Sequence, residues 1–338
     1  MRENPIISVV MPVYNREQYL KESIESILKQ TFTDFEFIIV DDQSTDSSWQ
    51  IIQEYAKKDS RIIAVKNSGI KGCWAARNKG WDLAKGKYMA IMDSDDISVS
   101  ERLQQEFDFM EQNPDIDICG SWIEHFEADN KIITLPRLHH EIKDLMFFSD
   151  SISQPSAMIR LSSFEKLHLR YSNNIAEDYE LWSRAINKLK FANIPEVLLF
   201  YRVHANQTGS AQKYEQNSGA NDVRLRNLKN IGMELSVENQ KIYCDFFSEQ
   251  FNPKNIEEII SAIKIFEQIS IKGKKYGYGE NFQELIDFYQ KKATDCGILN
   301  NVTSLKTYFT LFRKLKKFKS LRTRLRYIYH CVRNLLCG

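Results

Sequence analysis

Residues 1–120 alternate between short apolar runs and stretches in which apolar residues recur every three or four positions. Four of the runs are rich in β-branched and aromatic residues, and they span 6–11, 35–40, 62–65 and 88–92. Apolar strands between amphipathic helices are typical of a mostly parallel sheet that helices cover on both faces. The alternation therefore predicts a layered α/β fold.

Polar clusters follow three of these predicted strands, at residues 12–15, 41–46 and 93–96. Because ligands of such sheets bind at the carboxyl ends of the strands, we expect the three clusters to form one binding site. The glycine fingerprint G-x-G-x-x-G is absent from the sequence, which excludes a dinucleotide site of that type.

The remaining pattern is less regular from residue 97 to 215 and mainly helical after 212. It predicts helices at 102–112, 177–188, 221–233, 255–269 and 281–295, and strands at 116–123, 157–160 and 197–203. His139 and His140 are interpreted as part of a loop, because adjacent side chains diverge and do not make a metal pair. We predict an α/β domain over 1–215, a helical extension over 216–302 and a tail over 303–338.

Charge is distributed unevenly along the chain. Residues 296–338 contain ten Lys and Arg and no acid, whereas the rest has 36 bases against 45 acids. An acidic body argues against nucleic acid as its ligand. No apolar run approaches the ~18 residues that span a bilayer. Without a signal peptide and with six cysteines in no metal or disulfide pattern, we expect a cytoplasmic protein with reduced thiols.

The tail combines those bases with one apolar stripe. Its apolar residues recur at steps of three or four, which predicts an amphipathic helix: Leu305, Tyr308, Phe312, Leu315, Phe318, Leu321, Leu325, Ile328, Val332 and Leu335. Such a helix can lie on an anionic membrane surface, with its bases at lipid phosphates. The alternative is a helix packed on the acidic surface of the body.

The sequence Asp93-Ser94-Asp95-Asp96 directly follows a predicted buried strand. Three carboxylates within four residues repel one another unless a cation or a network of donors relieves them. A divalent metal with diphosphate oxygens is the natural relief, since Mg²⁺ and Mn²⁺ prefer oxygen ligands. The alternative is a solvated acidic turn.

The other two clusters offer groups that recognise a base. A carboxylate of Asp41 or Asp42 can accept a hydrogen bond from a base imide, while Asp46 is placed to cap the following helix. Tyr14 can stack on a planar base, and the alternative is a ring that packs on a helix.

Ten short motifs together resemble the family 2 inverting glycosyltransferases, in the order of that family and over residues 5–210. They are Ile7–Asn15, Ser26–Thr31, Glu36–Thr45, Asn67–Gly69, Ala75–Gly80, Ala84–Tyr88, Met92–Asp96, Gln154–Ser156, Glu177–Trp182 and Tyr201–His204. The resemblance implies the A-type glycosyltransferase fold, with a nucleotide-sugar domain over 1–215.

The resemblance also implies a nucleotide site. Asp42 matches the acid that binds uracil, and Tyr14 matches the aromatic ring that lies over the base, with the Pro12 backbone beside it. Asn67 and Arg77 match positions that contact uridine and the diphosphate.

The D-x-D motif and two later residues complete the implied site. Asp93 matches the acid that contacts ribose, Asp95 matches the metal ligand, and Ser94 lies between them. Asp178 matches the general base, although an acid that opens a helix is also favoured by the helix dipole. His204 matches a second metal ligand of some members, and the alternative is a hydrogen-bonded structural histidine.

The expected activity is therefore transfer of a sugar from a UDP-sugar, with inversion and with Mn²⁺ or Mg²⁺. The expected acceptor is a hydroxyl of a glycan or lipid-linked glycan in bacterial surface-polysaccharide synthesis, at the inner face of the cell membrane. One alternative is a sugar-1-phosphate nucleotidyltransferase, for which residues 12–15 are a poor phosphate loop. The other is a catalytically silent scaffold that acts through its basic tail.

Overall fold

The computed structural model describes residues 4–127, 130–204, 212–248, 250–253 and 255–301. The chain divides into two compact units, residues 1–223 and 224–338. That division and the predicted boundary at residue 215 both fall within helix α9 (Lys213–Asn230). The predicted amphipathic tail, 303–338, lies outside the described residues.

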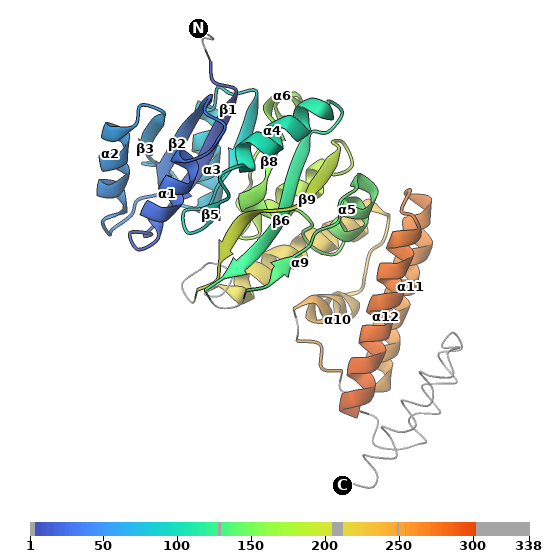
Figure 1. Ribbon diagram of the computed structural model, residues 1–338. Coiled ribbons are helices and arrows are strands. Elements are labelled where there is room, and N and C mark those ends of the chain that lie inside the picture. The colour runs from blue at the N-terminus through green and yellow to red at the C-terminus, as the bar shows by residue number, and fades with distance from the viewer. Residues whose placement is uncertain (1–3, 128–129, 205–211, 249, 254, 302–338) are drawn as a thin grey trace. The chain divides into compact units, whose positions relative to one another are not determined.

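The N-terminal part of the first unit has the predicted alternation (Figure 1). Strands β1 (Ile7–Val13), β2 (Phe35–Asp41), β3 (Ile62–Lys66) and β4 (Tyr88–Ile91) alternate with helices α1 (Leu20–Leu28), α2 (Ser48–Lys58) and α3 (Cys73–Leu83). These strands pair in parallel in the order β3-β2-β1-β4. Their carboxyl ends consequently meet at one edge of the sheet.

The rest of the first unit extends this sheet with strands of both directions. The elements are β5 (Ile97–Ser98), α4 (Arg102–Gln112), β6 (Ile118–Phe126), β7 (Ile132–Ile133), α5 (His139–Met146), η1 (Gln154–Ser156), β8 (Met158–Arg160), α6 (Leu161–Lys166), α7 (Glu177–Ala185) and β9 (Phe191–Arg202). Within the described residues the sheet has nine strands, ordered β3-β2-β1-β4-β8-β6-β9-β5, with β7 paired to β6. β8 is antiparallel to β4 and β6, so the sheet is mixed beyond β4.

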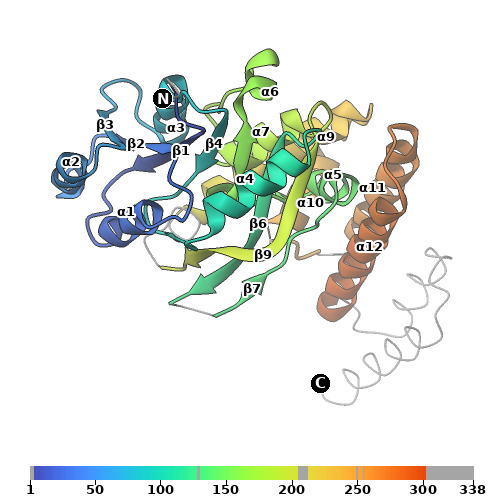
Figure 2. The same ribbon diagram turned by 45° about the horizontal axis from the view of Figure 1, so that its top comes forward.

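Helices cover both faces of the sheet because successive strand residues point to opposite sides. Val10 packs in one cluster with Trp81 of α3 and Trp182 of α7. Its neighbour Val9 packs in the other cluster with Ile24 of α1. Figure 2 shows α4 lying across β6 and β9, and these elements are in contact. Burial on both faces explains why the strands read as continuous apolar runs.

Three sequence-based assignments are corrected. His139 and His140 begin helix α5 and do not lie in a loop, and the His139 Nδ1 accepts a hydrogen bond from the Phe191 N–H at 3.2 Å. The strand predicted from residue 197 begins earlier, at Phe191, because residues from Phe191 onward pair in parallel with β6. The register of this pairing shifts between Ser121 and Ile123. Helix α10 (Val237–Phe247) was not expected, although Ser236 caps it by accepting from the Asn239 N–H at 3.3 Å.

In the second unit α10 is followed by α11 (Ile256–Lys275) and α12 (Glu280–Asn301), the orange and red helices of Figure 1. An aromatic cluster joins the three helices: Tyr243, Phe246 and Phe247 of α10, Phe266 of α11 and Tyr289 of α12. None of the described helices is both long and apolar enough to cross a membrane.

Candidate active site

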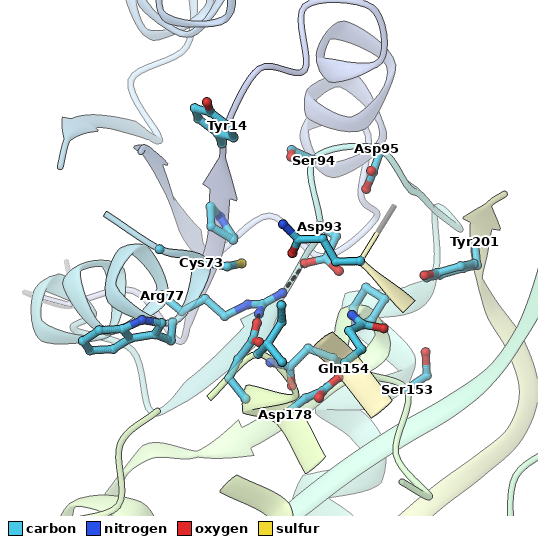
Figure 3. A pocket seen from close by; sticks show the side chains of 18 of the residues that line it. Tyr14, Cys73, Arg77, Asp93, Ser94, Asp95, Ser153, Gln154, Asp178 and Tyr201 are labelled. Carbon is cyan, nitrogen blue, oxygen red and sulfur yellow. Dashed lines mark hydrogen bonds and ion pairs between the residues drawn. The ribbon is translucent and has the colours of Figure 1, made fainter. Parts of the chain in front are cut away.

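A pocket of about 900 Å³ opens at the carboxyl ends of the parallel strands (Figure 3). It brings together eight of the residues predicted to bind nucleotide-sugar or act in catalysis: Pro12, Tyr14, Asp42, Arg77, Asp93, Ser94, Asp95 and Asp178. Asn67 and His204 do not line the pocket, but each contacts one of these residues, as described below. Figure 3 shows Tyr14 on one side of the pocket and Asp178, Gln154 and Ser153 on the other.

Hydrogen bonds join the turns after β1 and β2. Asn15 has a φ of 51°, and its Oδ1 accepts from the Thr45 N–H at 2.8 Å. The turn leaves Tyr14 41% exposed, with the Lys71 Nζ 3.8 Å from the centre of its ring. The Tyr14 ring is thus partly open to the pocket. Asp46 accepts from the N–H of Ser48, the first residue of α2, at 2.9 Å, while the N-cap residue of this helix is Ser47.

Asp42 is buried and fixed from two sides. Its Oδ1 accepts from the Asn67 Nδ2 at 2.7 Å, and its Oδ2 accepts from the Gly72 N–H at 2.8 Å. The second bond requires the Gly72 backbone at a φ of 144°, where a side chain would be strained. Asn67 thus holds Asp42 in place and does not itself face the pocket.

Arg77 joins the middle of the pocket to the start of α7. It donates to the Asp93 Oδ1 at 2.6 Å and also pairs with Glu177, and its side chain is only 6% exposed. The burial of Glu177 raises the pKa of its carboxyl to about 7, although the Arg77 charge opposes that rise. Arg77 remains protonated, because the carboxylates beside it stabilise its charge.

The D-x-D acids have separate protein donors. Asp95 accepts from the Arg16 Nε at 3.0 Å, and Asp96 accepts from the Arg202 N–H at 2.9 Å, while Asp93 has Arg77. The sequence interpretation took a metal as the natural relief of their repulsion. Each acid thus has a donor within the chain, while burial and the charges of Asp95 and Asp93 still raise the pKa of Asp96 well above its usual range.

His204 lies beside Asp95, with its Nε2 3.1 Å from the Asp95 Oδ2. Its ring packs against Tyr19 at a centroid distance of 4.7 Å. Among the described residues no group of three or more His, Cys, Asp or Glu side chains is arranged to hold a metal. Asp95 and His204 thus make a pair of candidate ligands and not a complete set.

Carboxyl groups with raised pKa values gather at the Asp178 end of the pocket. Burial raises the pKa of Asp178, whose Oδ1 accepts from the Tyr179 N–H at 2.7 Å at the start of α7. Burial and the negative charge of Asp178 raise the pKa of Asp150 well above its usual range. Carboxyl groups of this kind are typical of sites that exchange protons near neutral pH.

Several pocket residues were not predicted from the sequence as site residues. Arg16 directly follows the first cluster, and Gln154 belongs to a family-like motif, so both carried a signal. Asp150 and Lys71 lie in no such pattern, and only the folded chain brings them to the pocket.

Comparison with known proteins agrees with this geometry. The family model for glycosyl transferase family 2 matches residues 8–167. An uncharacterized glycosyltransferase of Methanocaldococcus jannaschii is 42% identical over 210 residues, which cover 60% of this chain and 72% of the relative. The chain belongs to glycosyl transferase family 2. It is therefore a glycosyltransferase, and Asp178 and His204 lie beyond the segment that the family model matches.

Two further proteins resemble this glycosyltransferase. The Escherichia coli UDP-Glc:α-D-GlcNAc-diphosphoundecaprenol β-1,3-glucosyltransferase WfaP is 31% identical over 248 residues, covering 72% of this chain and 92% of WfaP. The crystal structure of Staphylococcus aureus TarS 1–349 with UDP-GlcNAc has a TM-score of 0.57 at 17% identity, covering 85% of this chain and 92% of that one. The glycosyltransferase has the A-type fold that its sequence predicts.

Proposed function

We propose that this glycosyltransferase transfers a sugar from a UDP-sugar to a hydroxyl group of a glycan or lipid-linked glycan, with inversion at the anomeric carbon. The observation that carries the proposal is one pocket with Tyr14 on one side, Asp178 on the other and Arg77 between them (Figure 3). Asp42 also lines this pocket, and its turn is hydrogen-bonded to the turn of Tyr14. This order matches the base of a bound UDP-sugar, its diphosphate, and an acceptor beside its sugar.

The nucleotide end supplies the contacts that uridine needs. The exposed ring of Tyr14 offers a face for stacking once the Lys71 ammonium moves from it toward the diphosphate. Asp42 is held by Asn67 and Gly72, and each carboxylate oxygen keeps a further lone pair for the imide N–H of uracil. A fixed carboxylate of this kind selects uracil over a base without that donor.

A divalent metal fits the Asp95 side of the pocket. Adjacent ligand atoms around Mg²⁺ or Mn²⁺ are about 3 Å apart, which suits the 3.1 Å between the Asp95 Oδ2 and the His204 Nε2. Such metals in nucleotide sites take one or two protein ligands and complete their shell with phosphate oxygens and water. When bound, the metal would offset negative charge on the departing diphosphate. Arg16, now paired with Asp95, is placed to contribute positive charge to the same group.

Asp178 is proposed as the general base. In an inverting transfer the acceptor hydroxyl attacks the anomeric carbon on the face opposite the leaving diphosphate, and a carboxylate takes its proton. Asp178 lies across the pocket from the nucleotide end, and its raised pKa favours accepting a proton. Arg77, bound to Asp93 and Glu177, fixes the start of α7 relative to the D-x-D turn.

One relative supports the proposed acceptor. WfaP is named for a UDP-glucose donor and a diphosphoundecaprenol-linked sugar acceptor, which supports a lipid-linked acceptor here.

We propose a cytoplasmic enzyme that associates with the inner face of the membrane through residues 303–338. The test is sedimentation with anionic liposomes at low salt, comparing the full chain with one that ends at Val302. Equal sedimentation of the two chains would contradict this role of the tail.

The donor is tested by the release of UDP from a panel of UDP-sugars with Mn²⁺, through slow hydrolysis without acceptor. We expect one or two UDP-sugars to be hydrolysed and their ADP analogues, whose base lacks the imide donor, to be inert. Release of pyrophosphate from a nucleoside triphosphate would instead indicate a nucleotidyltransferase, and no nucleotide binding at all would indicate a silent scaffold.

A further inference from the structure

Gln154 places a buried amide in the pocket at the Asp178 end. It opens η1, directly before β8, and β8 pairs with the strand that leads to Asp93. Its side chain is only 4% exposed, and the Nε2 donates to the Tyr171 hydroxyl at 3.0 Å. The backbone is fixed as well, because its carbonyl accepts from the Ala157 N–H at 3.1 Å.

The other half of this amide has no partner within the described residues. The Gln154 Oε1 is buried and accepts no hydrogen bond. A buried acceptor without a donor costs about 1–3 kcal/mol, so a group that satisfies it gains affinity. Because Gln154 lines the pocket, that donor is available from a bound ligand.

Asp150 provides a second acceptor at the same end. Its Oδ1 accepts from the Ile152 N–H at 3.1 Å, which anchors the carboxyl group in the pocket wall. It lies close enough to Asp178 for the Asp178 charge to disfavour ionisation of Asp150.

The basic side chains of the pocket are engaged elsewhere. Arg16 pairs with Asp95, Lys71 lies over Tyr14, Arg77 pairs with Asp93 and Glu177, and Arg202 binds the Asp95 carbonyl. Arg77 is the cation whose charge reaches Asp178, and it is already paired with Asp93 and Glu177. The acceptors at the Asp178 end thus suit a ligand rich in hydroxyl donors. An additional carboxylate or phosphate on the sugar would be repelled there.

We propose that Gln154 and Asp150 form a subsite that binds hydroxyl groups of a neutral sugar beside Asp178. The inference rests on the proposed transferase function and adds the class of sugar that the site accepts. The hydroxyl groups belong either to the sugar of the donor or to the acceptor, and the two sources are separated by experiment.

The test compares Gln154→Met with Tyr171→Phe. Methionine keeps the volume of the side chain and removes both hydrogen bonds, whereas Tyr171→Phe removes only the partner of the Nε2. In the donor arm, calorimetry measures the affinity for UDP and for UDP-glucose, UDP-galactose, UDP-N-acetylglucosamine and UDP-glucuronic acid with Mn²⁺. In the acceptor arm, methyl glycosides of glucose, N-acetylglucosamine and glucuronic acid are tested as stimulants of UDP release.

We expect Gln154→Met to bind UDP within two-fold of wild type, which shows an intact nucleotide site. We expect it to lose about five- to ten-fold in affinity for a neutral sugar in one arm, the scale of one hydrogen bond. Loss in the donor arm assigns the subsite to the donor sugar, and loss in the acceptor arm assigns it to the acceptor. The glucuronic acid probe should be the poorest ligand of that arm.

Unchanged affinity in both arms would overturn the proposal, as would an equal loss in Tyr171→Phe, because Gln154 would then only support the pocket wall. These outcomes differ from a failure of the proposed function. In that case the wild type itself would bind neither UDP nor any UDP-sugar, and both proposals would fall together.

Discussion

The two ends of the pocket handle carboxyl groups in opposite ways. At the nucleotide end, Asp42 receives hydrogen bonds from Asn67 and Gly72 and cannot move. At the transfer end, burial raises the pKa values of Asp150 and Asp178. A carboxylate held by donors is suited to recognise a base, whereas one that ionises with difficulty is suited to take up a proton.

The boundary between the two ends is Arg77. Its guanidinium binds the D-x-D turn through Asp93 and the start of α7 through Glu177. The proposed function therefore separates nucleotide binding from proton transfer along the pocket, and the buried Arg77 links the two ends. Substitutions at the two ends should accordingly affect different measurements.

The largest effect is expected from Asp95→Ala, between the two ends. We expect turnover to fall below detection and the dependence of UDP affinity on Mn²⁺ to disappear, because a metal held by Asp95 and His204 would lose its carboxylate ligand. Calorimetry with and without Mn²⁺ measures the second effect, and thermal unfolding checks the fold. Equal UDP affinity with and without Mn²⁺ in wild type and variant alike would contradict the metal site.

Asp178→Asn should separate the effect on the rate from the effect on donor binding most clearly. We expect transfer or hydrolysis to slow by at least ~10²-fold, the usual scale for loss of a general base, with UDP-sugar affinity within a few-fold of wild type. The measurements are single-turnover UDP release and calorimetry. Turnover near the wild-type rate would show that Asp178 only caps α7 and that the base lies elsewhere.

Asp42→Ala should produce the reverse pattern. We expect UDP affinity to fall by about ten-fold or more, because the Asn67 amide and the Gly72 N–H lose their shared acceptor and uracil loses its partner. At saturating UDP-sugar the rate of UDP release should stay near that of wild type. A matched control is Asp46→Ala, which removes the acceptor of the Ser48 N–H in the same loop. Equal loss of UDP affinity in both variants would show that only loop order matters.

The smallest expected effect concerns pH. Transfer should require ionised Asp178, so the rate falls as pH drops through a pKa above the usual aspartate range of ~4. The Asp178 charge raises the pKa of Asp150 well above its usual range, so Asp150 is neutral while Asp178 ionises. Asp150→Asn replaces that neutral carboxyl group with a neutral amide, and the midpoint of this acid limb should stay at the wild-type pH. The pH profile of UDP release measures the midpoint in both proteins. A midpoint that moves to lower pH would contradict this order of ionisation.

Local patterns were sufficient for the nucleotide half of the fold. Strands such as β1 and β2 are buried on both faces, so their apolar runs are visible in the sequence, and the polar residues that follow them mark the site. Parallel pairing then brings Tyr14 and Asp42 together without information from distant segments.

The transfer end was only partly predictable for the opposite reason. Asp150 lies between α5 and η1 in a segment without a periodic pattern, and it reaches the pocket through the pairing of β8 with β4 and β6. The hydrogen bond from Arg16 to Asp95 could not be predicted from the sequence, because the fold brings these two residues together. The contact of Glu177 with Arg77 depends on a fold that joins residues far apart in sequence.

The central claim is that Asp178 acts on the face of the donor sugar opposite the diphosphate. It is tested most directly by proton NMR of the sugar released at early times from the UDP-α-sugar that the enzyme hydrolyses, with water in place of the acceptor. In-line displacement assisted by Asp178 predicts that the β-anomer appears first and that Asp178→Asn suppresses its formation. Initial release of the α-anomer would contradict the account.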